Sequence, residues 1–123
     1  MEIIYSSSKL ENVCTQIKSA KKFFGGDVQL SLSLHARINA LASAETLHDI
    51  IVQPQFRFHN LHNIGSNQLE GYFAINVKTA KEPWRIILQP LDENRNSCLK
   101  SSIDEIACSV RIVKIIKVSK HYE

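Results

Sequence analysis

The spacing of apolar residues changes part-way along this chain, from a helical period to a strand period, and this change restricts the folds it can adopt. Apolar residues recur at helical spacing over residues 10–24 and again over residues 30–41, which predicts two amphipathic helices. Gly25-Gly26 stands between them, and glycine ends a helix in the left-handed conformation without strain. We therefore expect this part of the chain to form an antiparallel helical hairpin.

Polar residues at the starts of both predicted helices support this interpretation. Ser8 precedes Glu11 by three residues, which is the spacing of a capping box. Asp27 stands where the second helix needs its N-cap. We also expect the short apolar segment at residues 3–5 to form a strand that precedes the first helix, and a short apolar patch at residues 47–52 follows the second.

From Pro54 on, apolar and polar residues alternate, which is the period of a strand with one buried face. Residues 57–61, 72–78 and 84–88 show this alternation. Residues 110–118 are rich in β-branched side chains, which favours a strand, although their basic residues recur every third position, as on one face of a helix. Consecutive strands of this kind usually pair in antiparallel fashion.

These elements together predict a single α+β domain over residues 1–123. The helical hairpin would pack on one face of a mainly antiparallel, twisted sheet of about four to five strands. A polar loop at residues 92–97 and a helical turn at residues 102–107 would precede the last strand. The length is ordinary for one domain, and the sequence shows no internal repeat and no linker.

Composition argues against several classes of protein. No run of roughly 18 apolar residues is present, so no membrane-spanning helix is expected. The first residues lack the pattern of a signal peptide, and we therefore expect a cytoplasmic protein. The three cysteines contain no CxxC motif, which favours thiols in a reducing compartment over a zinc or thioredoxin-like site. They are Cys14, Cys98 and Cys108.

The formal net charge is +3, which is mild for a nucleic-acid-binding protein. The excess is uneven, because the last segment carries four basic residues against Glu123 alone. They are Arg111, Lys114, Lys117 and Lys120. This basic strip can face phosphates, or it can be the solvated edge of a strand where lysines discourage aggregation.

Three segments of the chain resemble parts of the RelE-type toxin fold, and together they point to its HigB branch. Residues 55–61, Gln-Phe-Arg-Phe-His-Asn-Leu, look like the family strand that carries an Arg or Asn, an apolar residue, a His and then a Leu. Residues 69–77 and 84–88 look like its two central strands, the second of which opens with a Trp-Arg pair. Residues 118–123 look like its closing strand, which ends close to a His.

This resemblance implies a function. The chain would be the toxin of a type II toxin–antitoxin system, a ribosome-dependent endoribonuclease that cleaves mRNA and so inhibits translation. Cleavage would need neither metal nor cofactor, because a ribose 2′-OH attacks the adjacent phosphate. The implied partners are the ribosome, its mRNA and a HigA-type antitoxin with a helix-turn-helix domain. Operator DNA would be contacted through the antitoxin, and no membrane is involved.

Such a cleavage needs a base for the 2′-OH, an acid for the 5′-oxygen and cations for the charge on phosphorus. The resemblance assigns the proton transfers to His59 and His121 and leaves open which one is the acid. Arg85 matches the phosphate-binding cation. It alternates with Trp84 and Ile86, so it faces away from the helices if that pair faces them.

Other residues at matching positions have secondary roles. Arg57 and Lys120 are further candidates for RNA or phosphate binding, and Tyr122 can stack on a base or bond to the phosphate. Each candidate also has a purely structural interpretation. His59 can be a half-buried strand residue, Arg85 can pair with a carboxylate on a neighbouring strand, and Tyr122 can be an anchoring aromatic.

The other histidines and one alternative function remain to be considered. His59 and His62 have HxxH spacing, but no third ligand stands out, so a metal site is not expected. His35 and His48 are expected at the surface or at helix edges. The alternative function is a non-catalytic RNA- or protein-binding module with the same fold.

Overall fold

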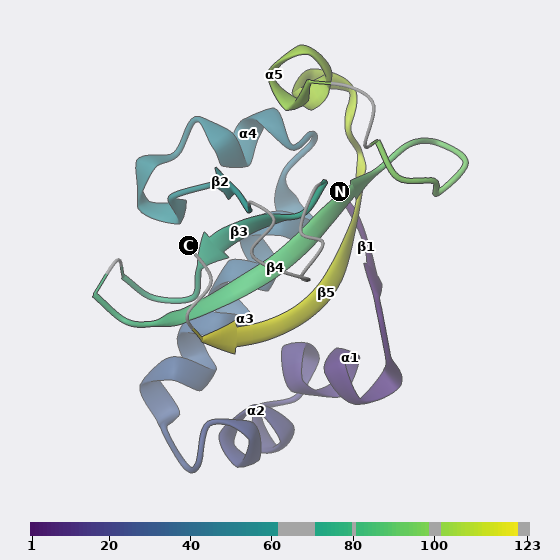
Figure 1. Cartoon of the computed structure of the whole chain (residues 1–123). Coiled ribbons are helices and arrows are strands. Elements are labelled where there is room, and N and C mark those ends of the chain that lie inside the picture. Colours follow the sequence, from purple (N-terminus) through teal and green to yellow (C-terminus); the bar gives the residue numbers. More distant parts are fainter. Residues whose placement is uncertain (62–70, 80, 99–101, 121–123) are drawn as a thin grey trace, which may run out of the picture.

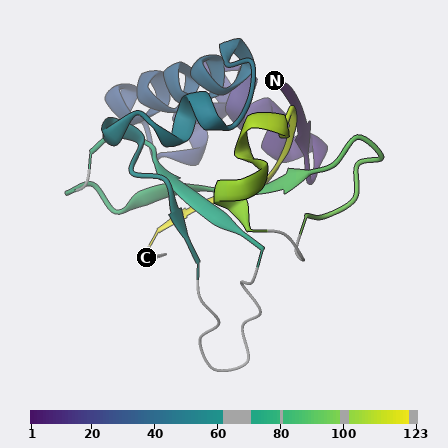
Figure 2. The same cartoon turned by 90° about the horizontal axis from the view of Figure 1, so that it is seen from above.

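In the computed structural model of the chain, helices α1 to α4 cover one face of a five-stranded sheet (Figures 1 and 2). The structure describes residues 1–61, 71–79, 81–98 and 102–120. The strand order is β1-β5-β4-β3-β2. The strands are β1 (Glu2–Tyr5), β2 (His59–Asn60), β3 (Phe73–Asn76), β4 (Trp84–Leu91) and β5 (Ile112–Lys120).

The fold is α+β, as the sequence predicts, and the sheet is mixed. Strands β2 to β5 pair in antiparallel fashion in chain order, whereas β1 pairs with β5 in parallel. The helices are α1 (Ser8–Thr15), α2 (Ile17–Phe23), α3 (Val28–Ser43), α4 (His48–Ile51) and α5 (Ile103–Ile106), and the 3-10 turns are η1 (Pro54–Phe56) and η2 (Ala107–Ser109). No helix in the described ranges has the length and apolar character needed to cross a bilayer.

The first predicted helix is divided into two, so the prediction of one continuous helix over residues 10–24 is wrong. Gln16 has extended backbone angles, φ −123° and ψ 125°, and separates α1 from α2. The hydroxyl of Thr15 donates to the carbonyl oxygen of Glu11 at 2.7 Å, a bond that bends helices. One consequence is that Ile17, which belongs to the predicted apolar stripe, is 38% exposed.

The predicted N-cap residue is confirmed for α3 and is wrong for α1. Asp27 caps α3, because its Oδ1 accepts from the backbone N–H of Leu30 at 3.0 Å, and the α3 stripe is buried. The first cap is Ser7 rather than Ser8. The hydroxyl oxygen of Ser7 accepts from the N–H of Leu10, and Ser8 is already helical. Gly25 and Gly26 adopt positive φ, as their place after α2 requires.

His35 is half-buried, whereas His48 is exposed. The Nε2 of His35 donates to the carbonyl oxygen of Val13 at 3.1 Å, so this half-buried side chain joins α3 to α1. His48 is exposed at the start of α4, as expected.

The alternation predicted for the central strands is confirmed. Residues at one set of positions pack into the main core beneath the helices, and these are Phe73, Ile75, Val77, Ile86 and Leu88. Between them, Ala74 and Ile87 form a second cluster with Leu61 on the other side of the sheet. The strand predicted at residues 57–61 shortens to His59–Asn60, because Arg57 ends η1 with φ 48°, a left-handed conformation that no strand contains.

Arg37 on α3 joins the helix layer to the end of β3. Its Nε donates to the carbonyl oxygens of Asn76 at 3.1 Å and Val77 at 3.3 Å. One of its terminal nitrogens donates to the carbonyl oxygen of Lys78 at 2.9 Å. The guanidinium also lies 4.7 Å from the centre of the Phe56 ring. Desolvation by the surrounding protein lowers the pKa of Arg37, so this charge is partly shielded from water.

We predict that Arg37→Met lowers the free energy of unfolding by about 2 kcal/mol, because it leaves carbonyl groups at the end of β3 without a donor. Urea denaturation followed by circular dichroism measures this loss. The matched control is Arg111→Met, which removes an exposed pair with Glu45 at 3.6 Å and should change stability by less than about 0.5 kcal/mol. Equal losses in the two variants would contradict the prediction.

A buried thiol and a half-buried phenol make stability depend on pH in the alkaline range. Burial raises the pKa of the Cys14 thiol from its ordinary value of 9.0 to about 12. Burial, assisted by the nearby Cys14 and Glu11, raises the pKa of the Tyr5 phenol from 10.0 to about 12. In both cases the unfolded chain ionises first. The stability from these groups is therefore complete below the unfolded pKa and is lost as pH rises toward the folded one.

We expect the free energy of unfolding to fall between about pH 9 and pH 12. Cys14→Ala should be less stable at neutral pH, because it leaves a small cavity, but its stability should fall less steeply above pH 9. Denaturation curves recorded over this pH range measure both slopes. Identical slopes for the two proteins would show that the Cys14 thiol does not contribute.

Candidate functional site

Two rows of residues cross the sheet on the face that points away from the helices, which we call the far face. Residues directly opposite one another on paired strands lie on the same face. The first row joins His59 on β2 to Ala74 on β3 and Ile87 on β4. The second row joins Asn76 on β3 to Arg85 on β4, which lies opposite Ser119 on β5.

Arg85 lies on the far face, as the alternation with Trp84 and Ile86 predicts. Its side chain is only 2% exposed, which the sequence does not indicate. The Nη1 group donates to the carbonyl oxygen of Trp84 at 2.9 Å and to that of Glu82. The turn that precedes β4 therefore holds the guanidinium in place and fixes a buried positive charge at the start of the strand.

The ring of His59 is oriented by its own segment of chain. Its Nδ1 lies 2.7 Å from the carbonyl oxygen of Arg57, and a carbonyl can only accept, so Nδ1 carries the hydrogen in the neutral ring. The opposite nitrogen, Nε2, is buried and has no hydrogen-bond partner. In the neutral ring Nε2 is therefore the nitrogen without a hydrogen, and in this conformation it is covered by the surrounding protein.

Asn76 is a polar residue of the far face that the candidate set from the sequence does not include. It is 2% exposed, and its side-chain oxygen Oδ1 is buried without a hydrogen-bond partner. A buried amide oxygen without a donor is unfavourable by about 1–3 kcal/mol, so such groups call for an explanation. The signal that points to it is its position, on the same face as Arg85 in an otherwise apolar strand.

The far-face residues are close enough to act on one small group. His59 and Arg85 lie two strands apart in the sheet and two residues apart in register. Strand spacing of about 4.8 Å and a rise of about 3.3 Å per residue place their Cα atoms roughly 12 Å apart. The two residues therefore flank the same part of the far face. Between them lies the small side chain of Ala74.

The other sequence candidates are placed differently. Arg57 is exposed at the end of η1 and contributes its carbonyl oxygen to His59. Lys120 lies on the helix side of the sheet, where its Nζ is 5.0 Å from the centre of the Trp84 ring. His121 and Tyr122 lie outside the described residues, as does His62 of the HxxH pair.

The basic strip predicted for the last segment does not form one surface. Lys114 and Lys117 lie opposite Gln89 and Ile87, on the far face, whereas Lys120 lies on the helix side. Arg111 precedes β5 and pairs with a glutamate. Over the described ranges, no three His, Cys, Asp or Glu side chains are grouped so that they could hold a metal ion.

Comparisons with protein-family models, with curated proteins and with solved structures gave no match to this chain. The placement of His59, Asn76 and Arg85 therefore carries the functional argument.

We predict that Asn76→Leu stabilises the protein by about 1 kcal/mol, because it replaces a buried side chain whose amide oxygen has no partner with an apolar side chain of similar size. The backbone carbonyl that accepts from Arg37 is unchanged. Urea denaturation measures the change, and Asn60→Leu, at an exposed position of β2, is the control, with an expected change within about 0.5 kcal/mol. A loss of stability in Asn76→Leu would show that the amide is satisfied in the folded protein.

Proposed function

We propose that this chain is a HigB-type toxin of the RelE superfamily, a metal-independent endoribonuclease that cleaves mRNA on the ribosome. The observation that carries the proposal is the far face of the sheet, where the unprotonated Nε2 of His59 and the buried charge of Arg85 are held on neighbouring rows. The resemblance of three sequence segments to this family is a second, separate support for the proposal.

In this proposal His59 is the base of the reaction. Its Nε2 takes the proton from a ribose 2′-OH, the 2′-oxygen attacks the adjacent phosphorus, and the bond from phosphorus to the 5′-oxygen breaks. His121 then gives a proton to the departing 5′-oxygen. The orientation of His59 favours this division of roles, because the Arg57 carbonyl keeps the hydrogen on Nδ1 and leaves Nε2 able to accept.

Arg85 stabilises the negative charge that develops on the phosphorane. The medium around a buried guanidinium has a low dielectric constant, so its charge interacts more strongly with the phosphorane than it would in water. At 2% exposure it acts in this conformation through its field rather than by a direct bond to phosphate. Asn76, beside it in the same row, is equally buried, and its side-chain oxygen has no hydrogen-bond partner in this conformation.

The remaining parts of the proposal come from the family resemblance. The toxin works in the cytoplasm on mRNA in the ribosome, with Tyr122 stacking on a base and with Arg57 and Lys120 as further contacts to RNA. A HigA-type antitoxin with a helix-turn-helix domain neutralises it and connects it to operator DNA.

A second candidate function is a non-catalytic binding module with a RelE-like fold. The burial of Arg85 and the position of Lys120 on the helix side favour it, because both remove cations from the surface that would meet RNA. The modest net charge points the same way.

We predict that expression of the chain in a bacterial host produces new mRNA 5′ ends inside coding regions, and that His59→Ala abolishes them. Loss of a general base lowers the cleavage rate by about 10²- to 10⁴-fold. Mapping of 5′ ends together with growth curves measures both effects, and His121→Ala should behave alike. The control is His48→Ala, because His48 is exposed on α4 and should leave cleavage unchanged.

Two outcomes would contradict the proposal in different ways. Cleavage that persists in a folded His59→Ala protein would remove His59 from the chemistry. Normal growth with intact mRNA on expression of the unaltered chain would contradict the toxin function and favour the binding module. Thermal unfolding of each variant shows whether a lost activity is a lost fold.

A further inference from the structure

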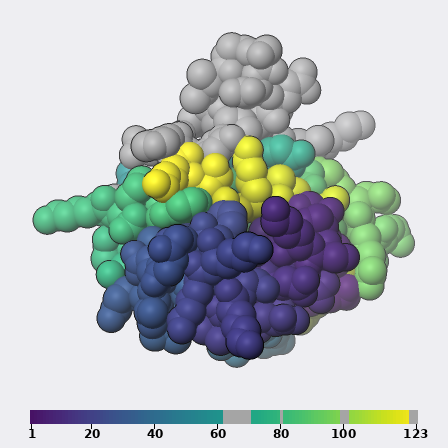
Figure 3. Space-filling view, turned by 90° about the horizontal axis from the view of Figure 1, so that it is seen from below, coloured from purple at the N-terminus to yellow at the C-terminus, as the bar shows by residue number. Residues whose placement is uncertain are grey.

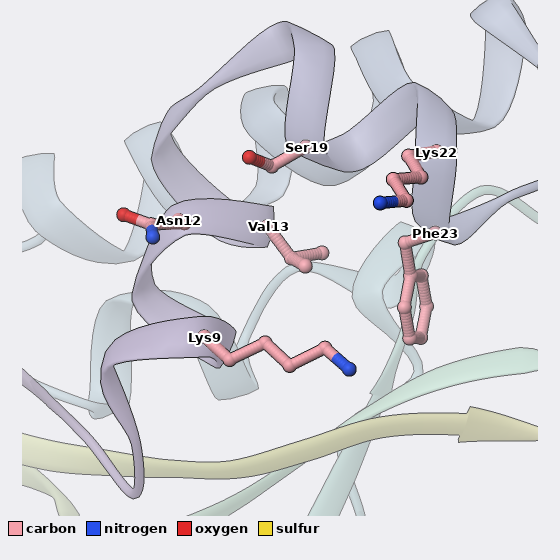
Figure 4. A pocket seen from close by; sticks show the side chains of 6 residues that line it. All are labelled: Lys9, Asn12, Val13, Ser19, Lys22 and Phe23. Carbon is pink, nitrogen blue, oxygen red and sulfur yellow. The ribbon is translucent and has the colours of Figure 1, made fainter.

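A groove on the helix side of the molecule lies between α1, α2 and the end of β5. It consists of two adjoining hollows of about 390 Å³ and about 190 Å³. Both hollows are lined by Lys9, Val13 and Phe23, so they form one continuous depression. Figure 3 shows this side of the molecule, with the purple and blue helices beneath the yellow β5, and Figure 4 shows the larger hollow from close by.

The groove combines an apolar floor with basic side chains. Val13 and Phe23 line both hollows, and the smaller one continues along Leu10 and Val118. Phe23 is 38% exposed, which is unusual for a side chain of this size and leaves an aromatic surface uncovered. In Figure 4 the ammonium groups of Lys9 and Lys22 both extend toward the space beside Val13 and Phe23.

The charge around the groove is strongly one-sided. Helices α1 and α2 carry four lysines, at positions 9, 18, 21 and 22, against one glutamate, Glu11. Lys9 and Lys22 form no ion pair with any part of the chain that the structure describes. An occupant with negative charge is therefore favoured by its electrostatic complementarity to this surface.

The strand edge beside the groove favours a polypeptide over a small anion. Strand β1 pairs with β5 only as far as Ile115, so within the described residues no strand pairs with the outer edge of residues 118–120. Val118 of this segment lines the smaller hollow. Backbone groups on such an edge can pair with an extended segment of another protein.

We propose that this groove binds an acidic, amphipathic segment of a partner protein. An apolar side chain of the segment packs against Phe23 and Val13, and its carboxylates pair with Lys9 and Lys22. The groove lies on the helix side of the sheet, whereas His59, Asn76 and Arg85 lie on the far face. The proposal therefore does not depend on the proposed ribonuclease activity.

The test uses a fluorescein-labelled designed peptide of about 10 residues, in which leucines and glutamates alternate so that they lie on opposite faces of an extended strand. Fluorescence anisotropy with the full chain measures its binding. We expect Lys9→Glu/Lys22→Glu to weaken binding by at least about 10-fold, because like charges then face each other. The matched control is Lys18→Glu/Lys21→Glu, which makes the same charge change on exposed residues outside the groove and should weaken binding by less than about 3-fold.

Three outcomes would overturn the proposal. The first is no measurable binding of the peptide to the unaltered protein. The second is an equal loss in both double variants, which would show attraction by net charge alone. The third is a single-stranded RNA oligonucleotide that displaces the peptide and loses its own affinity in Lys9→Glu/Lys22→Glu, which would make the groove an RNA site. A peptide with lysines in place of the glutamates controls for binding by leucine alone.

Discussion

Strand β4 is paired along both of its edges and buried on both of its faces, and the rest of the structure is arranged around it. Ile86, Ile87 and Leu88 are each fully buried, although neighbouring residues of a strand point to opposite sides of the sheet. Apolar side chains must therefore cover both faces of the sheet at residues 86–88. On one side they belong to the helix layer. On the other they form the smaller cluster of Ile87 with Ala74 and Leu61, and this cluster borders the candidate site.

The burial of β4 explains which features the sequence predicts. Helical and alternating periods depend on which side chains meet the core, so they indicate α3, the central strands and the face of Arg85. They do not show how deeply a residue is covered, since that depends on segments distant in sequence. For this reason, the 2% exposure of Arg85 and the burial of the Asn76 amide could not be predicted from the sequence. Local backbone features, such as the break between α1 and α2 at Gln16, depend on individual hydrogen bonds. The spacing of apolar residues does not reveal them.

The parallel pairing of β1 with β5 is a further feature that local patterns do not contain. An apolar segment at residues 3–5 predicts a strand but carries no information about its direction or partner. The direction follows from the path of α1 to α4, which leads the chain from one end of β1 across the sheet before the meander begins. Because β1 is short, it leaves the last residues of β5 without a strand on their outer side, and this creates the edge beside the lysine-lined groove.

The polar groups of the far face weaken the fold that carries them. A buried guanidinium, a ring nitrogen without a partner and an amide oxygen without a donor are each less favourable than an apolar side chain in the same place. Their grouping on two adjacent rows of one face is what a site selected for chemistry rather than stability would show. The groove on the helix side has a different character, since the charges that line it are exposed lysines beside apolar side chains. A partner bound in that groove would not cover the far face, because the groove and the far-face residues lie on opposite sides of one sheet.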